Sequence, residues 1–176
     1  LMEFFTQEQE QVTMEALTLL LKFPRNTLVA DCKKMLKAGL MIQVLEYLEE
    51  DYHDPFPEKN PAWLAVTHCL NIIGALKAKE ALPEVLDLLR NDEFTLEYFF
   101  GDFPDYSLTP TLFALCQDDP RPLINYLHEP FKYYFNRIHA SDTLAQIALH
   151  HPEHREVIIE GFRSLWEKCL DPKQSA

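Results

Sequence analysis

Glycine and alternating β-branched runs are scarce in this chain, which has only 4 glycines among its 176 residues. Tight β-hairpins depend on glycine in their turns, and half-buried strands depend on alternating apolar and polar residues. We therefore predict an all-α protein without a sheet. The sequence also lacks an apolar run of the roughly 18 residues that a membrane-spanning helix needs, so no membrane partner is expected.

Signatures of catalysis and secretion are missing as well. The sequence contains no H-E-x-x-H, no G-x-S-x-G, no glycine-rich phosphate loop and no dinucleotide-binding fingerprint. Its four cysteines, at 32, 69, 116 and 169, never form C-x-x-C and favour reduced, mostly buried thiols in a cytoplasmic protein. Residues 1–5 lack the basic flank of a signal peptide, and the leucine start indicates a processed or partial chain. We predict no cofactor, and an enzyme is disfavoured.

Basic residues are outnumbered by acidic ones, 16 against 28, and the formal net charge is −12. Proteins that bind the phosphate backbone of nucleic acids do so with clustered Lys and Arg, so this balance disfavours a nucleic-acid partner. Another protein that carries a basic segment fits the charge of the chain better.

Residues 60–90 have the pattern of two antiparallel helices joined by a short turn. Asn60 and Pro61 form a helix start, because Asn caps free N–H groups and Pro suits the first helical position. Gly74 lies near the end of the first helix, where a small residue lets a neighbouring helix approach. Pro83 is tolerated only in a first turn, which places the start of the second helix at about 78–80. The apolar stripe of the first helix is Ala62, Val66, Cys69, Ile73 and Leu76.

The apolar spacing of this first helix recurs elsewhere in the chain, which indicates a helical repeat with a period near 37 residues. A single forward shift onto 103–121 gives almost no match. The matching positions are Val29, Cys32 and Leu36, one period before Val66, Cys69 and Ile73, and Ala140, Leu144 and Ile147, two periods after Val66, Leu70 and Ile73. We predict one domain, 1–176, with regular units at about 25–52, 60–91 and 131–170 and an irregular middle at 92–130.

Breaking and capping residues predict the remaining helix bounds. Gly39 is expected to end one helix and separate it from the next. Thr109–Pro110, Asp119–Pro120 and His151–Pro152 are helix starts. The other expected helices cover about 7–22, 26–38, 40–51, 93–100 and 131–150.

The segment 73–77, IGALK, followed by 80–86, EALPEVL, resembles HEAT-type repeats, in which a small-residue joint precedes an Ala-Leu-Pro opening of the second helix. Residues 96–103, LEYFFGDF, are similar to a segment of an uncharacterised bacterial family of HEAT-like proteins, a domain of unknown function. The resemblance covers about 60–171 and implies a HEAT-like α-α superhelix. It brings no catalytic residues. Some members carry a C-terminal cysteine-rich zinc motif that this chain lacks, so no metal is carried over.

An acidic and aromatic stretch lies at the place where the repeat pattern fails. Asp92, Glu93, Glu97, Asp102 and Asp105 fall within fourteen residues and alternate with Phe and Tyr. Such a run is often a set of helix caps on a solvated face, but departures from a local pattern also occur at functional sites. The leading function is a protein-interaction module or scaffold. Its predicted binding residues are Glu97, Asp102, Asp105 and Tyr106.

The alternative is a metal-dependent or hydrolase-like enzyme. It would use the carboxylates of 92–105 or the histidines of 150–154. His150, His151 and His154 are the metal candidates, and their structural alternative is an exposed turn between two helices.

Overall fold

The computed structural model describes residues 22–49, 62–91, 107–130 and 134–170, with side chains for 22–37, 66–91, 107–130, 136–168 and 170. Every regular element in these ranges is helical, which confirms the all-α prediction for this part of the chain. None of the helices described is both long and apolar enough to cross a membrane. The elements are α2 (Arg25–Glu49), α3 (Ala62–Ala75), the 3-10 turn η2 (Lys79–Ala81), α4 (Leu82–Leu89), α6 (Leu108–Cys116), α7 (Arg121–Leu127), α8 (Tyr134–His150), the 3-10 turn η4 (Pro152–His154) and α9 (Arg155–Leu170).

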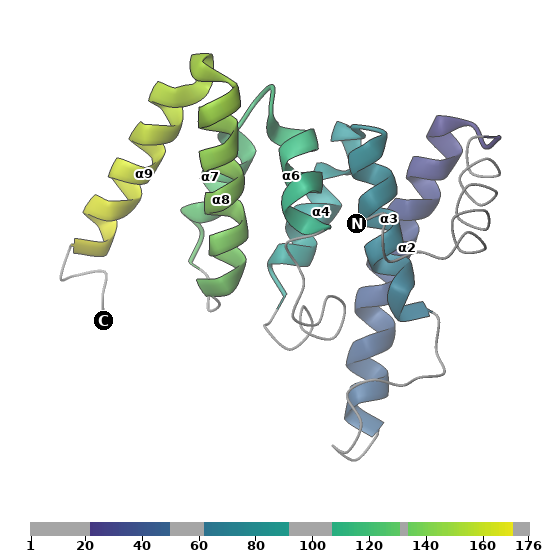
Figure 1. The fold of residues 1–176 in the computed structure, drawn as a ribbon. Coiled ribbons are helices and arrows are strands. Elements are labelled where there is room, and N and C mark those ends of the chain that lie inside the picture. Colours follow the sequence, from purple (N-terminus) through teal and green to yellow (C-terminus); the bar gives the residue numbers. More distant parts are fainter. Residues whose placement is uncertain (1–21, 50–61, 92–106, 131–133, 171–176) are drawn as a thin grey trace, which may run out of the picture.

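The helices follow one another in space in the order of the chain, from α2 at one end to α9 at the other (Figure 1). Helices α3, α6 and α8 pack side by side, and we call them the first row. Helices α4, α7 and α9 form the second row: α7 packs on α9, and the Tyr126 hydroxyl of α7 donates to the Leu89 carbonyl of α4 at 3.0 Å. Helix α2 packs along α3 and also contacts α4. Helices α6 and α7 are in contact, as are α8 and α9, whereas α4 packs on α2 more than on α3, so the expected antiparallel packing of α3 against α4 is not what holds α4 in place.

The core consists of the apolar stripes along these helices. Nine of the positions that carry the repeat pattern are buried, with at most 7% of their surface exposed, so the spacing correctly identified the inward face of α2, α3 and α8 over these positions. Burying one such side chain contributes about 1.5–3 kcal/mol. The nine are Val29, Cys32, Leu36, Val66, Cys69, Ile73, Ala140, Leu144 and Ile147.

The length of α2 contradicts one prediction made from the sequence. Gly39 was expected to separate two helices, but α2 runs without interruption from Arg25 to Glu49. One glycine inside a helix costs about 1 kcal/mol relative to alanine. Good helix formers such as Leu36, Lys37 and Leu40 surround it, and no proline occurs within α2, so the helix continues. The helices expected at 7–22 and 93–100 lie outside the described residues.

A short turn joins α3 to α4, as the sequence indicated. A lysine occupies the position in this turn that glycine usually takes. The Ala78 N–H donates to the Ile73 carbonyl and the Lys77 N–H donates to the Gly74 carbonyl, both at 3.0 Å. This is a helix-ending motif whose penultimate residue needs a left-handed backbone, and Lys77 takes that place with a φ of 47°. The 3-10 turn and then α4 follow at once, with Pro83 in the first turn of α4.

Helices α6 and α7 occupy the middle of the stack, where the sequence repeat could not be matched. They begin within one residue of their predicted starts. Helix α6 packs between α3 and α8 although its buried face includes a polar side chain, Thr111, which is 2% exposed. The Thr111 hydroxyl donates to the Leu70 carbonyl of α3 at 2.9 Å. A polar contact with the neighbouring helix thus stands where the apolar pattern would place an aliphatic residue.

Candidate functional site

The four predicted binding residues, Glu97, Asp102, Asp105 and Tyr106, lie outside the described residues, in the segment 92–106 between α4 and α6. The residues on both sides of that segment, up to Asn91 and from Ser107, are described. The prediction for these four residues stays a prediction.

A buried polar side chain lies at each flank of the segment 92–106. At its start, the Asn136 amide of α8 donates to the carbonyls of Leu89 at 2.8 Å and Asn91 at 3.1 Å. At its end, Ser107 is 6% exposed and precedes α6. The described residue before this segment, Asn91, therefore lies beside α8 and follows α4, and the described residue after it, Ser107, immediately precedes α6.

The histidine candidates surround an aromatic ring of α6. The Phe113 ring centroid lies 6.0 Å from that of His150, nearly perpendicular to it, and 5.9 Å from that of His151. The rings of His151 and His154 are 6.3 Å apart, and His151 Nδ1 lies 3.5 Å from a Glu153 oxygen. In the part of the chain that the structure describes, no three His, Cys, Asp or Glu side chains are grouped so as to hold a metal ion. The geometry is that of aromatic packing at the turn between α8 and α9.

Two described groups that could have served as nucleophile or base are shielded instead. Burial raises the pKa of the Cys116 thiol to about 12, so this thiol is protonated at neutral pH. Burial also raises the pKa of Tyr126 to about 12, and its hydroxyl is hydrogen-bonded to the Leu89 carbonyl. Both groups belong to the core and support packing.

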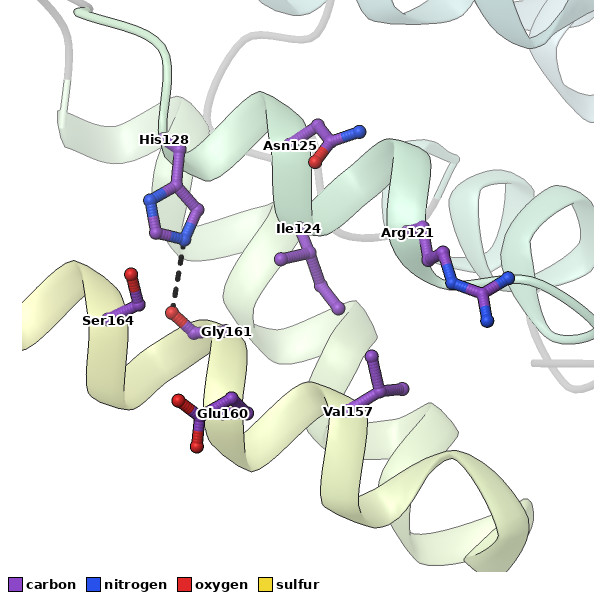
Figure 2. A pocket seen from close by; sticks show the side chains of 8 residues that line it. All are labelled: Arg121, Ile124, Asn125, His128, Val157, Glu160, Gly161 and Ser164. Carbon is purple, nitrogen blue, oxygen red and sulfur yellow. Dashed lines mark hydrogen bonds between the residues drawn. The ribbon is translucent and has the colours of Figure 1, made fainter.

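A groove of about 410 Å³ lies between α7 and α9 (Figure 2). Its floor forms where Gly161 of α9 approaches Ile124 of α7: a Cβ added to Gly161 would lie 2.7 Å from the Ile124 Cγ2 atom. Arg121 and Glu160 place opposite charges on its two sides. The sequence analysis did not predict this groove. The one feature of the sequence that could have indicated it is Gly161, a glycine inside an otherwise regular amphipathic helix. The lining residues are Arg121, Ile124, Asn125, His128, Val157, Glu160, Gly161 and Ser164.

His128 holds one end of the groove closed. Its Nε2 lies 3.1 Å from the Gly161 carbonyl oxygen, and its Nδ1 lies 3.1 Å from the Lys168 ammonium. An ammonium group only donates hydrogen bonds, so Nδ1 is the acceptor and the Nε2–H is the donor to Gly161. This chain of contacts fixes α9 against the end of α7.

The charges of the described helices balance, whereas the rest of the chain is strongly acidic. Among the residues with described side chains there are 12 acids and 13 bases. The whole chain has 28 acids and 16 bases, which leaves 16 acids and only 3 bases elsewhere. The stretches 49–58 and 92–106 carry five acids each and no Lys or Arg. The net charge of −12 therefore originates outside the balanced helices.

Ion pairs between neighbouring elements of the stack engage four of the twelve described acids. Arg90 of α4 binds Glu129, which follows α7, at 2.7 Å, and this contact lowers the pKa of the Glu129 carboxyl. Glu84 of α4 is 8% exposed and lies 3.3 Å from the ammonium groups of both Lys33 and Lys37 of α2. Other pairs of this kind are Arg25–Glu80 at 2.5 Å and Lys79–Asp118.

No protein-family model, no curated protein and no solved structure matches the chain. No residue role is therefore transferred from a relative, and the resemblance to HEAT-type repeats depends only on the residues that carry it.

Proposed function

We propose that this chain is a HEAT-like helical-repeat module of the bacterial cytoplasm that binds a basic segment of another protein. Helix pairs stacked in chain order form the kind of elongated scaffold that recognises extended partners. The observation that carries the proposal is the charge separation: the described helices are balanced, and the acid excess belongs to stretches such as 92–106 that connect them.

The ion pairs between the described helices matter because they engage carboxylates that a basic partner could otherwise bind. Glu80, Glu84 and Glu129 are each paired with Lys or Arg of a neighbouring helix. A basic partner would have to break such pairs in order to bind there. Acids in a stretch without Lys or Arg can instead form new pairs, and their summed field also speeds the encounter with a positively charged partner.

We assign the contact to Glu97, Asp102, Asp105 and Tyr106. Three carboxylates pair with Lys or Arg side chains of the partner, and the Tyr106 ring offers its face to a cation. Each exposed ion pair contributes about 0.2–1 kcal/mol. Three pairs together therefore change affinity by roughly 3- to 150-fold.

The test uses a fluorescently labelled peptide rich in Lys and Arg, with anisotropy measured at low and physiological salt. The wild type should bind, and its affinity should fall as salt rises because exposed charges are screened. The triple variant Glu97→Lys, Asp102→Lys, Asp105→Lys should lose binding by the factor given above. An acidic peptide of the same length should not bind.

A matched variant separates a local site from net charge alone. Asp142→Lys, Glu156→Lys and Glu167→Lys change the same number of charges on exposed positions of α8 and α9. We expect this variant to bind the basic peptide within about twofold of the wild type, since each exposed distant charge has a small effect. Equal weakening by the two triple variants, or no salt-dependent binding by the wild type, contradicts the proposal.

A further inference from the structure

Helix α9 carries large apolar side chains on its outward side. Ile159, Trp166 and Leu170 are 43%, 66% and 63% exposed, and we call these three residues the α9 stripe. Successive residues of an α-helix are about 100° apart around its axis, so the three side chains lie within about 40° of one another. The stripe adjoins Phe162, which packs against the core. The apolar surface of α9 is therefore wider than the part of it that contacts the stack.

The opposite side of α9 packs on the rest of the stack. The helix contacts α7 and α8, Ile158 is buried, and Gly161 approaches Ile124 of α7. By helical geometry the α9 stripe lies about 140–180° around the axis from Gly161. Helix α9 is at one end of the described stack (Figure 1), so the stripe faces away from the other described helices.

The charged side chains of α9 are balanced in sign. The whole chain carries a net charge of −12, so two copies repel each other at a distance. A surface with equal numbers of acids and bases permits contact between copies, because each sign can meet the other. Helix α9 has three exposed acids and three exposed bases, namely Glu156, Glu160, Glu167, Arg155, Arg163 and Lys168.

One antiparallel register of two α9 helices matches the stripe with itself. In an isologous contact, each residue faces the mirrored position of the other copy. Arg163 and Glu167 are symmetric about position 165, and Ile159 and Leu170 are symmetric about a point half a residue away. A two-fold axis there places Ile159 against Leu170 of the second copy. It also brings Trp166, one residue from the axis, against its own counterpart.

We propose that the α9 stripe is a self-association surface, on which a second copy of this chain docks with its own α9 in antiparallel orientation. Burial of the three apolar side chains of each copy supplies the attraction. The proposal goes beyond the interaction function and does not depend on it, because it uses no residue of 92–106.

The charged residues beside the stripe fix the orientation of the two helices. In the antiparallel register, Arg163 pairs with Glu167 of the second copy, and Glu167 pairs with Arg163 of that copy. A parallel contact would instead bring the two Arg163 side chains together, which is unfavourable. Arg163 also forms an exposed ion pair with Glu160 of its own helix. A guanidinium group has five N–H donors, so it can bind both carboxylates.

Sedimentation equilibrium of the whole chain, from micromolar to millimolar concentration, tests the surface. The wild type should show a reversible equilibrium between monomer and dimer. Trp166→Ser should weaken the dimer by roughly 30-fold or more, because it removes the largest side chain beside the axis from both copies. The matched control Phe23→Ser removes a 57% exposed aromatic ring near α2, at the other end of the stack, and should change the dimer by at most about twofold. A wild type that stays monomeric, or equal weakening by the two substitutions, would overturn the proposal.

Charge reversal tests the antiparallel register in the same experiment. Arg163→Glu and Glu167→Arg should each weaken the dimer by roughly 2- to 30-fold, since each removes two exposed ion pairs. The double variant with both substitutions restores opposite charges at both contacts, so its dimer should return to within about twofold of the wild type. A double variant as weak as the single variants would contradict the proposed docking.

The fluorescence of Trp166 distinguishes a second copy from other occupants of the stripe. The substitution Trp63→Phe leaves Trp166 as the one tryptophan of the chain. Acrylamide should quench its emission readily in the dilute monomer and less readily as the dimer forms. Protection that is already complete in the monomer would mean that a segment of the same chain covers the stripe. Either that result or quenching that does not change with concentration would refute self-association through α9.

Discussion

The contacts α3–α6 and α7–α9 both depend on a glycine, and they differ in what that glycine meets. A Cβ added to Gly74 would lie 2.8 Å from the Thr111 hydroxyl oxygen and 3.1 Å from the Thr111 Cα, which is part of the backbone. A Cβ added to Gly161 would meet only atoms of the Ile124 side chain. At Gly74 the Thr111 backbone leaves no room for an added methyl group. At Gly161 the contact lies beside a groove, and the Ile124 side chain can rotate away.

This difference indicates that the two rows differ in how well their helix contacts tolerate a larger side chain or a small shift of one helix. The first row is closed by backbone approach and by the buried hydrogen bond from Thr111 to Leu70. The second row is joined by ion pairs and by the contacts of His128, which are more exposed and more adjustable. If binding of a partner requires the stack of helices to change shape, we expect the change at the contact between α7 and α9.

The largest effect is expected for Gly74→Ala. Overfilling a packed contact costs about 1–3 kcal/mol, and the gain in helix propensity returns up to about 1 kcal/mol, so the net loss should be about 1–2 kcal/mol. Urea unfolding of wild type and variant measures it. An unchanged midpoint would show that α3 and α6 are not in backbone contact.

Thr111→Val sharpens the same contact. The substitution keeps the shape of the side chain but removes the donor to the Leu70 carbonyl, and a net loss of about 1 kcal/mol is expected for one buried hydrogen bond. Because Thr111 touches Gly74, the effects of the two substitutions should not add. Strict additivity in the double variant would argue that the two residues do not share one contact.

Glu129→Gln examines the second row through pH. The Arg90 guanidinium lowers the pKa of Glu129 below its ordinary value of 4.5, so the stabilisation is complete above that value and disappears as the pH falls through the lowered pKa. The variant should be less stable at pH 7 by up to about 1 kcal/mol, because the pair is partly screened by solvent. Thermal melts from pH 7 to pH 3 should show the two proteins converging in acid. A gap that persists at pH 3 would assign the effect to something other than this ion pair.

Gly161→Ala should have the smallest effect. Rotation of the Ile124 side chain relieves the overlap, and the gain in helix propensity of up to about 1 kcal/mol offsets the cost. We expect a net change near zero in the same urea experiment that is used for Gly74→Ala. A loss as large as that of Gly74→Ala would remove the contrast between the two rows.

The sequence was most informative where apolar spacing and helix-breaking residues agree. The buried stripes of α3 and α8, the place of Pro83 in the first turn of α4 and the role of Gly74 could be predicted, because each follows from local periodicity or backbone geometry, although α4 begins at Leu82, after the predicted 78–80. The prediction that a helix ends at Gly39 was wrong because a single glycine only weakly disfavours a helix when strong helix formers surround it. One residue favours or disfavours a helix only weakly, and the summed helix propensity of its neighbours decides whether the helix continues.

The contacts between successive pairs could not be predicted in the same way. Thr111 interrupts the apolar pattern and yet is buried against α3, because its hydroxyl donates to a carbonyl 41 residues away in the chain. The groove beside Gly161 also depends on which helix lies opposite α9. Such features arise from the stacking of pairs, which the periodicity of one helix does not encode.

A designed disulfide tests the order of the stack most directly. The added Cβ of Gly74 lies 3.4 Å from the Thr111 Cβ, close to the 3.5–4.5 Å that a disulfide requires. The double variant Gly74→Cys, Thr111→Cys is oxidised in its native state and digested, and a control pairs Gly74→Cys with Asn125→Cys on α7. We predict a link between positions 74 and 111 and none between 74 and 125. Failure of the first link, or equal formation of both, would contradict the successive stacking of α3 and α6.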